Sequence, residues 1–316
     1  MRTFLRAQAQ HFTDALTVYS AGPGGLIRTL ADGFTRDTGL PVNIYQATTG
    51  KVLARLEAES ASPQADLFIS ASWDTARALQ SRGWLAPMLA PAAAALPAQF
   101  RSDTCAAQGI SALGIIWHED CPAPAPFDWQ DLADPIYQDR IVTPDPALSG
   151  AAVDLLLGLQ HALGDRAWAL FDALRSNRMT VAGANAQALA AVLRRERGLV
   201  FGAVDYMAHD SINQGAPVRF IMPASGTVIA PRPMMVLNSS LRQEQAFAFV
   251  DHVLSEAGQT AVAEAGLIPA RFGIATPHGR SLRDVTLLQL AQAHESTRLA
   301  VRSRFADLFS VAGQAG

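Results

Sequence analysis

The sequence is poor in charged residues, in aromatic residues and in clustered positive charge. Of the 316 residues, 17% are charged and 7% are aromatic, and the formal net charge is −3. The densest basic run is the short stretch Arg194–Arg197, which is typical of a solvated helix end. Proteins that bind nucleic acid neutralise phosphates with clustered Lys and Arg, so nucleic acid is not an expected partner.

The sequence also lacks long apolar runs. No stretch reaches the roughly 18 apolar residues that a membrane-spanning helix needs. Residues 1–15 contain Arg2 and Arg6 but no apolar segment of the kind found in signal peptides. We interpret these residues as an N-terminal arm or the remnant of a leader.

Cysteine is scarce. Cys105 and Cys121 are the only two, and neither lies in a C-x-x-C or histidine-rich stretch, so a zinc site is not expected. The pair is compatible with one disulfide in an oxidising compartment and also with two separate thiols. The strand predicted between them would hold the two side chains apart unless the chain turns within it.

Catalytic motifs are absent as well. The sequence contains no G-x-S-x-G, no H-E-x-x-H and no phosphate-binding P-loop. We therefore expect a binding protein with no catalytic residues, no cofactor and no resident metal. The alternative is that the chain is an intracellular enzyme or sensor that shares its fold with such binding proteins.

What the sequence does contain is enough apolar material for two cores. Hydrophobic residues make up 49% of a chain that is longer than most single domains, so two lobes are expected. Strand and helix patterns alternate, which predicts an α/β fold with parallel strands. We expect the first lobe to comprise residues 16–103 and 228–316, the second lobe residues 104–227, and crossing strands to join them.

The clearest pattern is a short apolar strand, a turn of small residues and a helix. It occurs at 16–37, at 42–58 and again at 66–81, and a related pattern begins with the strand at 141–142. Turns of this kind bring backbone N–H groups, hydroxyls and the positive end of a helix dipole to one edge of a sheet. Because ligands of open α/β sheets lie outside the carboxyl ends of the strands, we predict an anion site there.

Three sets of segments resemble the solute-binding proteins of ABC importers, in the branch that includes binders of ferric iron, molybdate, phosphonates and sugar phosphates. They lie in the first seventy residues, in the middle of the chain and near residue 260. The segments are Leu16–Ser20, Thr49–Lys51 and Ala65–Ser70; Trp129–Pro135, Arg140–Ile141, Asp145–Pro146 and Ser149–Gly150; and Ala246–Val250, Ser255–Gln259 and Ala265–Arg271.

The resemblance implies a two-lobed periplasmic-binding-protein fold of type II, with mixed, mostly parallel sheets and a hinge of crossing strands. A small anionic ligand would be trapped between the lobes and passed to a permease in the membrane. Such proteins are usually periplasmic, and we expect a monomer. Because no leader is visible, a cytoplasmic relative remains the alternative location.

The resemblance also suggests two kinds of ligand. Iron-binding members use adjacent tyrosines after a strand equivalent to 199–204, whereas this chain has Asp205-Tyr206-Met207 with a single tyrosine. A phosphonate or phosphate ester would use the anion-holding turns, and Asp205 could meet the ammonium group of 2-aminoethylphosphonate. Asp205 could equally be a helix cap. Iron binding through Tyr206 is the alternative.

The expected ligand-binding residues lie in the strand-to-helix turns of both lobes. They are Ser20, Gly22, Gly24, Gly25, Thr48, Thr49, Gly50, Ser70, Ser72, Ser149, Gly150, Ala151, Asn185, Asp205 and Tyr206. For Gly24, Gly25 and Thr48 a purely structural role, in helix packing or capping, is the other interpretation. The role of the tail after Pro277 is left open.

Overall fold

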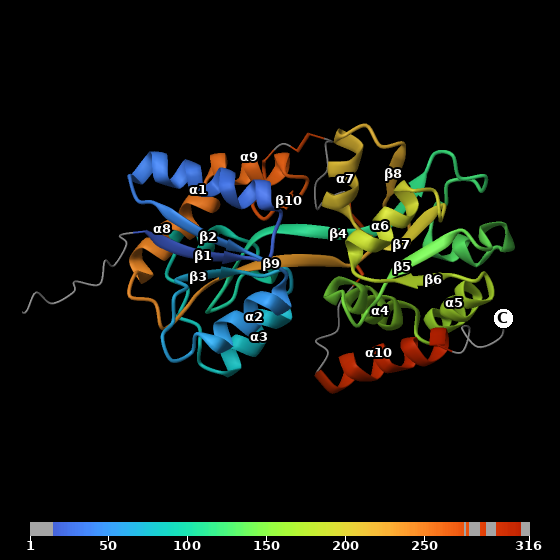
Figure 1. Ribbon diagram of the computed structural model, residues 1–316, viewed down its shortest axis with the longest axis horizontal. Helices are drawn as coiled ribbons and strands as arrows, with labels where there is room; N and C mark the ends of the chain where they lie inside the picture. Colours follow the sequence, from blue (N-terminus) through green and yellow to red (C-terminus); the bar gives the residue numbers. More distant parts are fainter. Residues whose placement is uncertain (1–14, 275, 278–284, 289–294, 311–316) are drawn as a thin grey trace, which may run out of the picture.

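The computed structural model describes residues 15–274, 276–277, 285–288 and 295–310. Two lobes lie side by side and are joined by two long strands (Figure 1). In the first lobe, parallel strands alternate with helices, as the sequence predicts. These elements are β1 (Leu16–Ser20), α1 (Gly24–Thr38), β2 (Val42–Gln46), α2 (Thr49–Ala58), β3 (Leu67–Ile69) and α3 (Trp73–Ser81).

The second lobe repeats this arrangement. Its parallel strands are β5, β6 and β7, and a helix follows each of them. The elements are β5 (Ile141–Pro144), α4 (Gly150–Leu163), α5 (Asp165–Ser176), β6 (Thr180–Ala182), α6 (Asn185–Leu193), β7 (Leu199–Val204), α7 (Asp205–Asn213) and β8 (Val218–Ile221).

The hinge consists of β4 (Ala106–His118) and β9 (Ile229–Val236), which cross between the lobes. The first half of β4 pairs with β9 as far as Ala112, and from Leu113 onward β4 pairs with β7. One strand therefore belongs to both sheets, in the order β2-β1-β3-β9-β4-β7-β5-β6. The two-lobed fold with crossing strands is confirmed.

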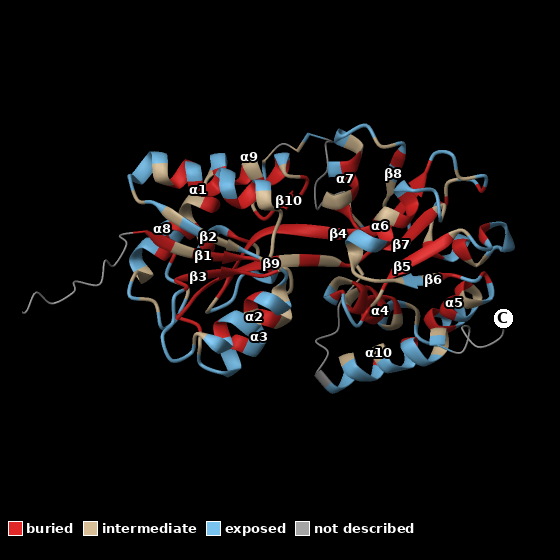
Figure 2. Cartoon of the chain, viewed as in Figure 1, coloured by how far each residue is buried: buried red, intermediate tan, exposed pale blue. Residues whose placement is uncertain are grey.

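Each sheet has a buried core on both faces (Figure 2). All 13 residues of β4 are buried, which agrees with its mostly apolar sequence. The remaining elements close the lobes. They are the short 3-10 helices η1 (Pro91–Ala95), η2 (Ala98–Phe100), η3 (Trp129–Ala133) and η4 (Pro135–Tyr137), then α8 (Gln243–Val253), α9 (Glu256–Glu264) and β10 (Ile268–Pro269).

The last helix, α10 (Glu295–Ser310), packs on the second lobe, against α4 and α5. Val301 and Phe305 lie one helical turn apart and are 4% and 2% exposed, and the Phe305 ring lies 5.9 Å from that of Phe171. The expectation that residues 228–316 belong to the first lobe is therefore wrong for this helix, because its apolar stripe completes the second core. Part of the preceding segment lies outside the described residues.

The two cysteines are both free thiols. They flank β4, and 13 residues of extended strand span about 43 Å, which is far beyond the reach of a disulfide. Cys105 is buried in the first lobe, whereas Cys121 is partly exposed beyond the other end of the strand. The structure thus favours the interpretation as two separate thiols.

The different surroundings of the thiols predict different reactivities. Burial raises the pKa of Cys105 to about 11, so its reactive thiolate is rare at pH 8. We expect a chromogenic aryl disulfide to titrate one thiol, Cys121, in the native protein and two after denaturation. Cys121→Ser should abolish the native reaction. Rapid labelling of both thiols in the folded protein would contradict the buried position of Cys105.

Candidate functional site

Six strand-to-helix turns gather on the facing sides of the two lobes (Figure 1). The carboxyl ends of parallel strands share one edge of a sheet, so three turns come from each lobe. Every expected ligand-binding residue lies in one of them. The first lobe contributes Ser20 to Gly25, Thr48 to Gly50, Ser70 and Ser72, and the second contributes Ser149 to Ala151, Asn185, Asp205 and Tyr206.

A cavity of about 510 Å³ lies between the lobes. Its walls are the start of α1, part of α9, and α6 and α7 of the second lobe. Of the predicted residues it includes Gly24, Gly25 and Tyr206. Two smaller cavities, of about 310 and 140 Å³, are lined by other parts of the chain.

Serine hydroxyls stabilise the turns of the first lobe. The Ser20 Oγ accepts a hydrogen bond from the Gly22 N–H at 3.2 Å, and the Ser70 Oγ accepts one from the Ser72 N–H at 3.2 Å. These are local turn interactions that fix the backbone. A hydroxyl that accepts in this way keeps its own O–H for donation to a ligand.

Several helix starts in the turns have no side-chain cap. Helices α1, α2 and α6 begin without a side-chain hydrogen bond to their first turn, whereas in α7 the Asp205 carboxylate accepts one from the Tyr206 N–H. Thr48 occupies the N-cap position of α2, but its hydroxyl does not cap the helix. First-turn N–H groups that lack a capping side chain carry partial positive charge and suit an anion.

The glycines of the first turn differ in their surroundings. A Cβ on Gly24 would lie 2.4 Å from Oε1 of Gln46, whose Nε2 donates to the Gly22 carbonyl at 2.9 Å. These atoms are the far end of an exposed side chain that can move, so packing against Gln46 does not by itself require glycine at Gly24. A Cβ on Gly25, Gly50 or Gly150 would meet nothing within 4 Å, so packing does not require glycine there.

Ser149 links two turns of the second lobe. Its Oγ accepts a hydrogen bond from the Ala152 N–H at 3.2 Å and donates to Oδ1 of Asn185 at 3.0 Å. The first bond caps α4, as the sequence predicts, and the second orients the amide at the start of α6. The two residues that the sequence proposed separately are therefore in direct contact.

Removing this hydroxyl should have a modest and measurable cost. We expect Ser149→Ala to lower the free energy of unfolding by about 1 kcal/mol, the usual value of an N-cap serine. Urea denaturation would measure it, with Ser310→Ala as a control because that exposed hydroxyl donates to the carbonyl of Asp307 within its own helix and caps no helix start. An unchanged stability would contradict the capping role.

Asp205 and Tyr206 begin α7 on the second lobe. Asp205 is completely buried, and its Oδ1 accepts a hydrogen bond from the Tyr206 N–H at 2.8 Å. Tyr206 is partly buried and lines the interlobe cavity. Its ring lies near Arg232, whose Cζ is 5.7 Å from the ring centroid.

The sequence analysis missed Arg232, which lies on the hinge strand β9. Its side chain is 3% exposed, and its Nη2 donates to the Ala21 carbonyl at 2.6 Å. Burial lowers the pKa of the guanidinium, and the nearby Tyr206 and Asp205 act in the opposite direction. The sequence feature that could have identified Arg232 is a single cation inside the apolar run 229–236, because a buried strand seldom contains an arginine.

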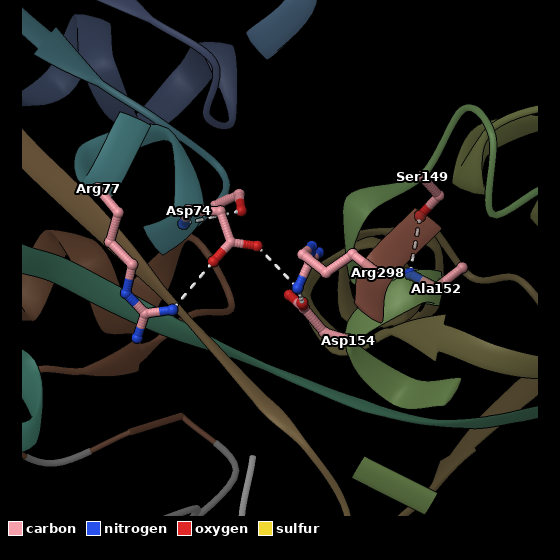
Figure 3. A network of polar contacts seen from close by, with 7 residues as sticks. Asp74, Arg77, Ser149, Ala152, Asp154 and Arg298 are labelled. Carbon is pink, nitrogen blue, oxygen red and sulfur yellow. Dashed lines mark hydrogen bonds and ion pairs between the residues drawn. The ribbon is translucent and has the colours of Figure 1, made fainter. Parts of the chain in front are cut away.

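Arg298 of α10 connects the lobes at a second place (Figure 3). Its Nη1 donates to Oδ1 of Asp154 on α4 at 2.8 Å and lies 2.7 Å from Oδ2 of Asp74 at the start of α3. Only the contact with Asp154 has the geometry of a hydrogen bond. Burial raises the pKa of Asp154 to about 6, and Arg298 works against this shift.

Residues 16–268 match a family of proteins described as bacterial extracellular solute-binding protein. This match covers most of the chain. The chain belongs to that family. Two structural findings are consistent with a binding protein of this type: the two-lobed fold, and a cavity lined by the start of α1 in the first lobe and the start of α7 in the second.

This solute-binding protein is similar to several named proteins. It is 25% identical over 279 residues to a putative 2-aminoethylphosphonate-binding periplasmic protein of Salmonella paratyphi A, covering 84% of this chain and 81% of the relative. It is 26% identical over 274 residues to an Fe(3+)-binding periplasmic protein of Serratia marcescens, with coverages of 80% and 77%.

The fold is also that of a solved structure, the periplasmic binding protein AfuA of Actinobacillus pleuropneumoniae with exogenous fructose-6-phosphate bound. The TM-score is 0.80 at 20% identity, and the match covers 94% of this solute-binding protein and 99% of AfuA. At this level of identity the likeness shows the fold. The relatives are named as binding proteins rather than enzymes.

Metal-ligating side chains are dispersed in the part of the solute-binding protein that the structure describes. Among those residues, no three His, Cys, Asp or Glu side chains form a group that could hold a metal ion. His118 and Asp120 belong to a turn in which the Asp120 N–H donates to Nδ1 of His118 at 3.1 Å. Nor does any described helix combine the length and apolarity needed to cross a bilayer.

Proposed function

We propose that this solute-binding protein traps a small phosphorus-containing anion, a phosphonate or phosphate ester, and delivers it to the permease of an ABC importer. The observation that carries the proposal is the arrangement of helix starts. Helices α1 and α2 from the first lobe and α6 from the second begin without side-chain caps on the facing sides of the lobes. Such helix starts favour an anion between them.

The names of the relatives support this choice of ligand. One is named for 2-aminoethylphosphonate, and AfuA was solved with fructose-6-phosphate. Both compounds carry a phosphorus oxyanion on a small polar body. For 2-aminoethylphosphonate, the carboxylate of Asp205 would face the ammonium group, and Asp205→Asn should then weaken binding of that ligand in particular.

Ligand capture would proceed by hinge closure. The crossing strands β4 and β9 connect the lobes, and the ligand would shift the population toward a closed state because only there does it contact both walls. We propose that the protein acts in the periplasm as a monomer, with the permease as its membrane partner.

Ferric iron is the second candidate, because Tyr206 supplies a phenol at the cavity and a relative is named for Fe(3+). Phenolate and carboxylate oxygens are the hard donors that Fe(III) prefers. An iron complex with a tyrosine ligand would be coloured, whereas a phosphonate complex would not.

A thermal-shift screen of metal-stripped protein tests both candidates. The panel is 2-aminoethylphosphonate, fructose 6-phosphate, inorganic phosphate, molybdate and Fe(III) citrate. A ligand that binds only the folded state raises the midpoint, in proportion to RT ln(1 + [L]/Kd). We expect a rise with a phosphorus compound. A coloured complex and a rise with iron alone would make this an iron carrier, and no response would remove the anion proposal.

A further inference from the structure

Arg232 carries a buried positive charge for which the described residues offer only partial compensation. Its Nη2 bonds the Ala21 carbonyl, whereas its Nε is buried and has no hydrogen-bond partner. Tyr206 and Asp205 attract the cation electrostatically, but its Nη2 hydrogen bond goes to a backbone carbonyl rather than to a carboxylate. A buried charge is costly unless it is paired and fully hydrogen-bonded, so an arrangement of this kind needs a reason.

The position of the guanidinium supplies that reason. The Ala21 carbonyl belongs to the first turn of the first lobe, and the Tyr206 ring belongs to the second lobe. Arg232 itself lies on the hinge strand between them. The cation therefore lies where both lobes meet, between the uncapped start of α1 and the start of α7, where Asp205 accepts from the Tyr206 N–H.

Gly22 leaves space next to this cation. A Cβ built on Gly22 would be 3.6 Å from Nη2 and 3.9 Å from Nε of Arg232, at ordinary contact distance. Because Gly22 has no side chain, a ligand oxygen can approach the guanidinium from the side of the turn. Arginine is well suited to this task, because its planar fork matches the geometry of phosphoryl oxygens and stays charged.

We propose that Arg232 is the charge-recognition residue of the site, which binds the oxyanion group of the ligand through its Nε. This inference rests on the proposed function and deepens it. It places the anionic end of the ligand at the hinge, next to Ser20–Gly25, and leaves the opposite wall for the remainder of the ligand. It also explains why a charge is retained inside a strand that is otherwise apolar.

The test compares the full-length wild type with Arg232→Gln, Arg232→Lys and the control Arg219→Gln. Arg219 is exposed on β8, and its Cζ lies 4.6 Å from the centroid of the Trp117 ring. Its replacement by glutamine therefore removes the same positive charge at a position outside the turns. Calorimetric titration with 2-aminoethylphosphonate, fructose 6-phosphate and inorganic phosphate gives the affinity. The thermal midpoint without ligand gives the stability.

We expect Arg232→Gln to weaken binding of the phosphorus ligand at least a hundredfold, while the ligand-free midpoint stays constant or rises. Arg232→Lys should lose less affinity, because it keeps the charge, and Arg219→Gln should bind like the wild type. A cation needed for folding would behave differently, because its loss would lower the midpoint and the affinity together.

Three results would overturn the inference while the wild type still binds a phosphorus compound. They are an affinity of Arg232→Gln within threefold of the wild type, equal losses in the Gln and Lys variants, and a ligand-free midpoint lowered by more than 10 °C. A wild type that binds none of the three probes would instead refute the proposed function, and this inference with it. If the wild type binds only Fe(III), Arg232→Gln should keep or tighten that binding.

Discussion

Replacing Arg298 with glutamine is expected to lower the free energy of unfolding by about 2–3 kcal/mol at pH 8 and by less than about 1 kcal/mol at pH 5. Removing one partner of a buried ion pair costs about 3–5 kcal/mol when the other charge stays unpaired. The side chains of Arg298 and Asp154 are 14% and 13% exposed, so this pair falls just below that range. Urea denaturation at the two pH values would measure the difference.

The pH dependence follows from Asp154. Its pKa in the folded protein, about 6, lies above the usual 3.8, so the folded state binds the proton more tightly than the unfolded chain does. The stabilisation that proton binding at Asp154 provides is therefore fully present below about pH 4, and it is lost as the pH rises through 6. At pH 5 the carboxyl is mostly protonated, so little ion pairing is left for the substitution to remove.

Two variants isolate this effect. Arg77→Gln also removes an arginine from Asp74, but Arg77 is 50% exposed, so we expect a loss below about 1 kcal/mol at either pH. The double variant Asp154→Asn/Arg298→Gln should recover much of the loss at pH 8, since the buried carboxylate that Arg298 compensates is then absent as well. A loss in Arg298→Gln that is equal at pH 5 and pH 8 would show that Asp154 is not the responsible partner.

The strand-to-helix turns were predictable because each is encoded locally. An apolar strand, a few small residues and an amphipathic helix occur within about 25 residues, and the parallel pairing of the strands then places the turns at one edge. Ser149 shows how far this reasoning extends. Its role as a helix cap could be predicted from the sequence, but its bond to Asn185, 36 positions away, could not.

Arg232 and α10 show what local patterns cannot provide. The acceptor for Arg232 is Ala21, 211 positions earlier in the chain, and no spacing rule joins the two residues. The apolar pair Val301 and Phe305 indicates that α10 buries one face, but not which lobe it covers. In both cases the deciding contacts form only when distant segments pack.

Gly22→Ala is expected to weaken binding of the phosphorus ligand about 30-fold, which corresponds to about 2 kcal/mol. The new methyl group would lie 3.6 Å from Nη2 of Arg232 and 3.4 Å from the Ser20 Oγ. It would therefore occupy the space through which a ligand oxygen approaches the guanidinium. Calorimetric titration with 2-aminoethylphosphonate and fructose 6-phosphate would measure the loss.

The folded state should tolerate this methyl group. Gly22 is not among the residues with positive φ, so alanine can adopt its backbone, and neither new contact is closer than ordinary van der Waals distance. The thermal midpoint without ligand should stay within about 2 °C of the wild type, because the smaller backbone entropy of the unfolded alanine chain offsets minor crowding. Gly24→Ala is a different case, since its Cβ would displace the Gln46 amide that donates to the Gly22 carbonyl. An unchanged affinity in Gly22→Ala would mean that the anion does not reach Arg232 over this turn, even if Arg232 proves essential for binding.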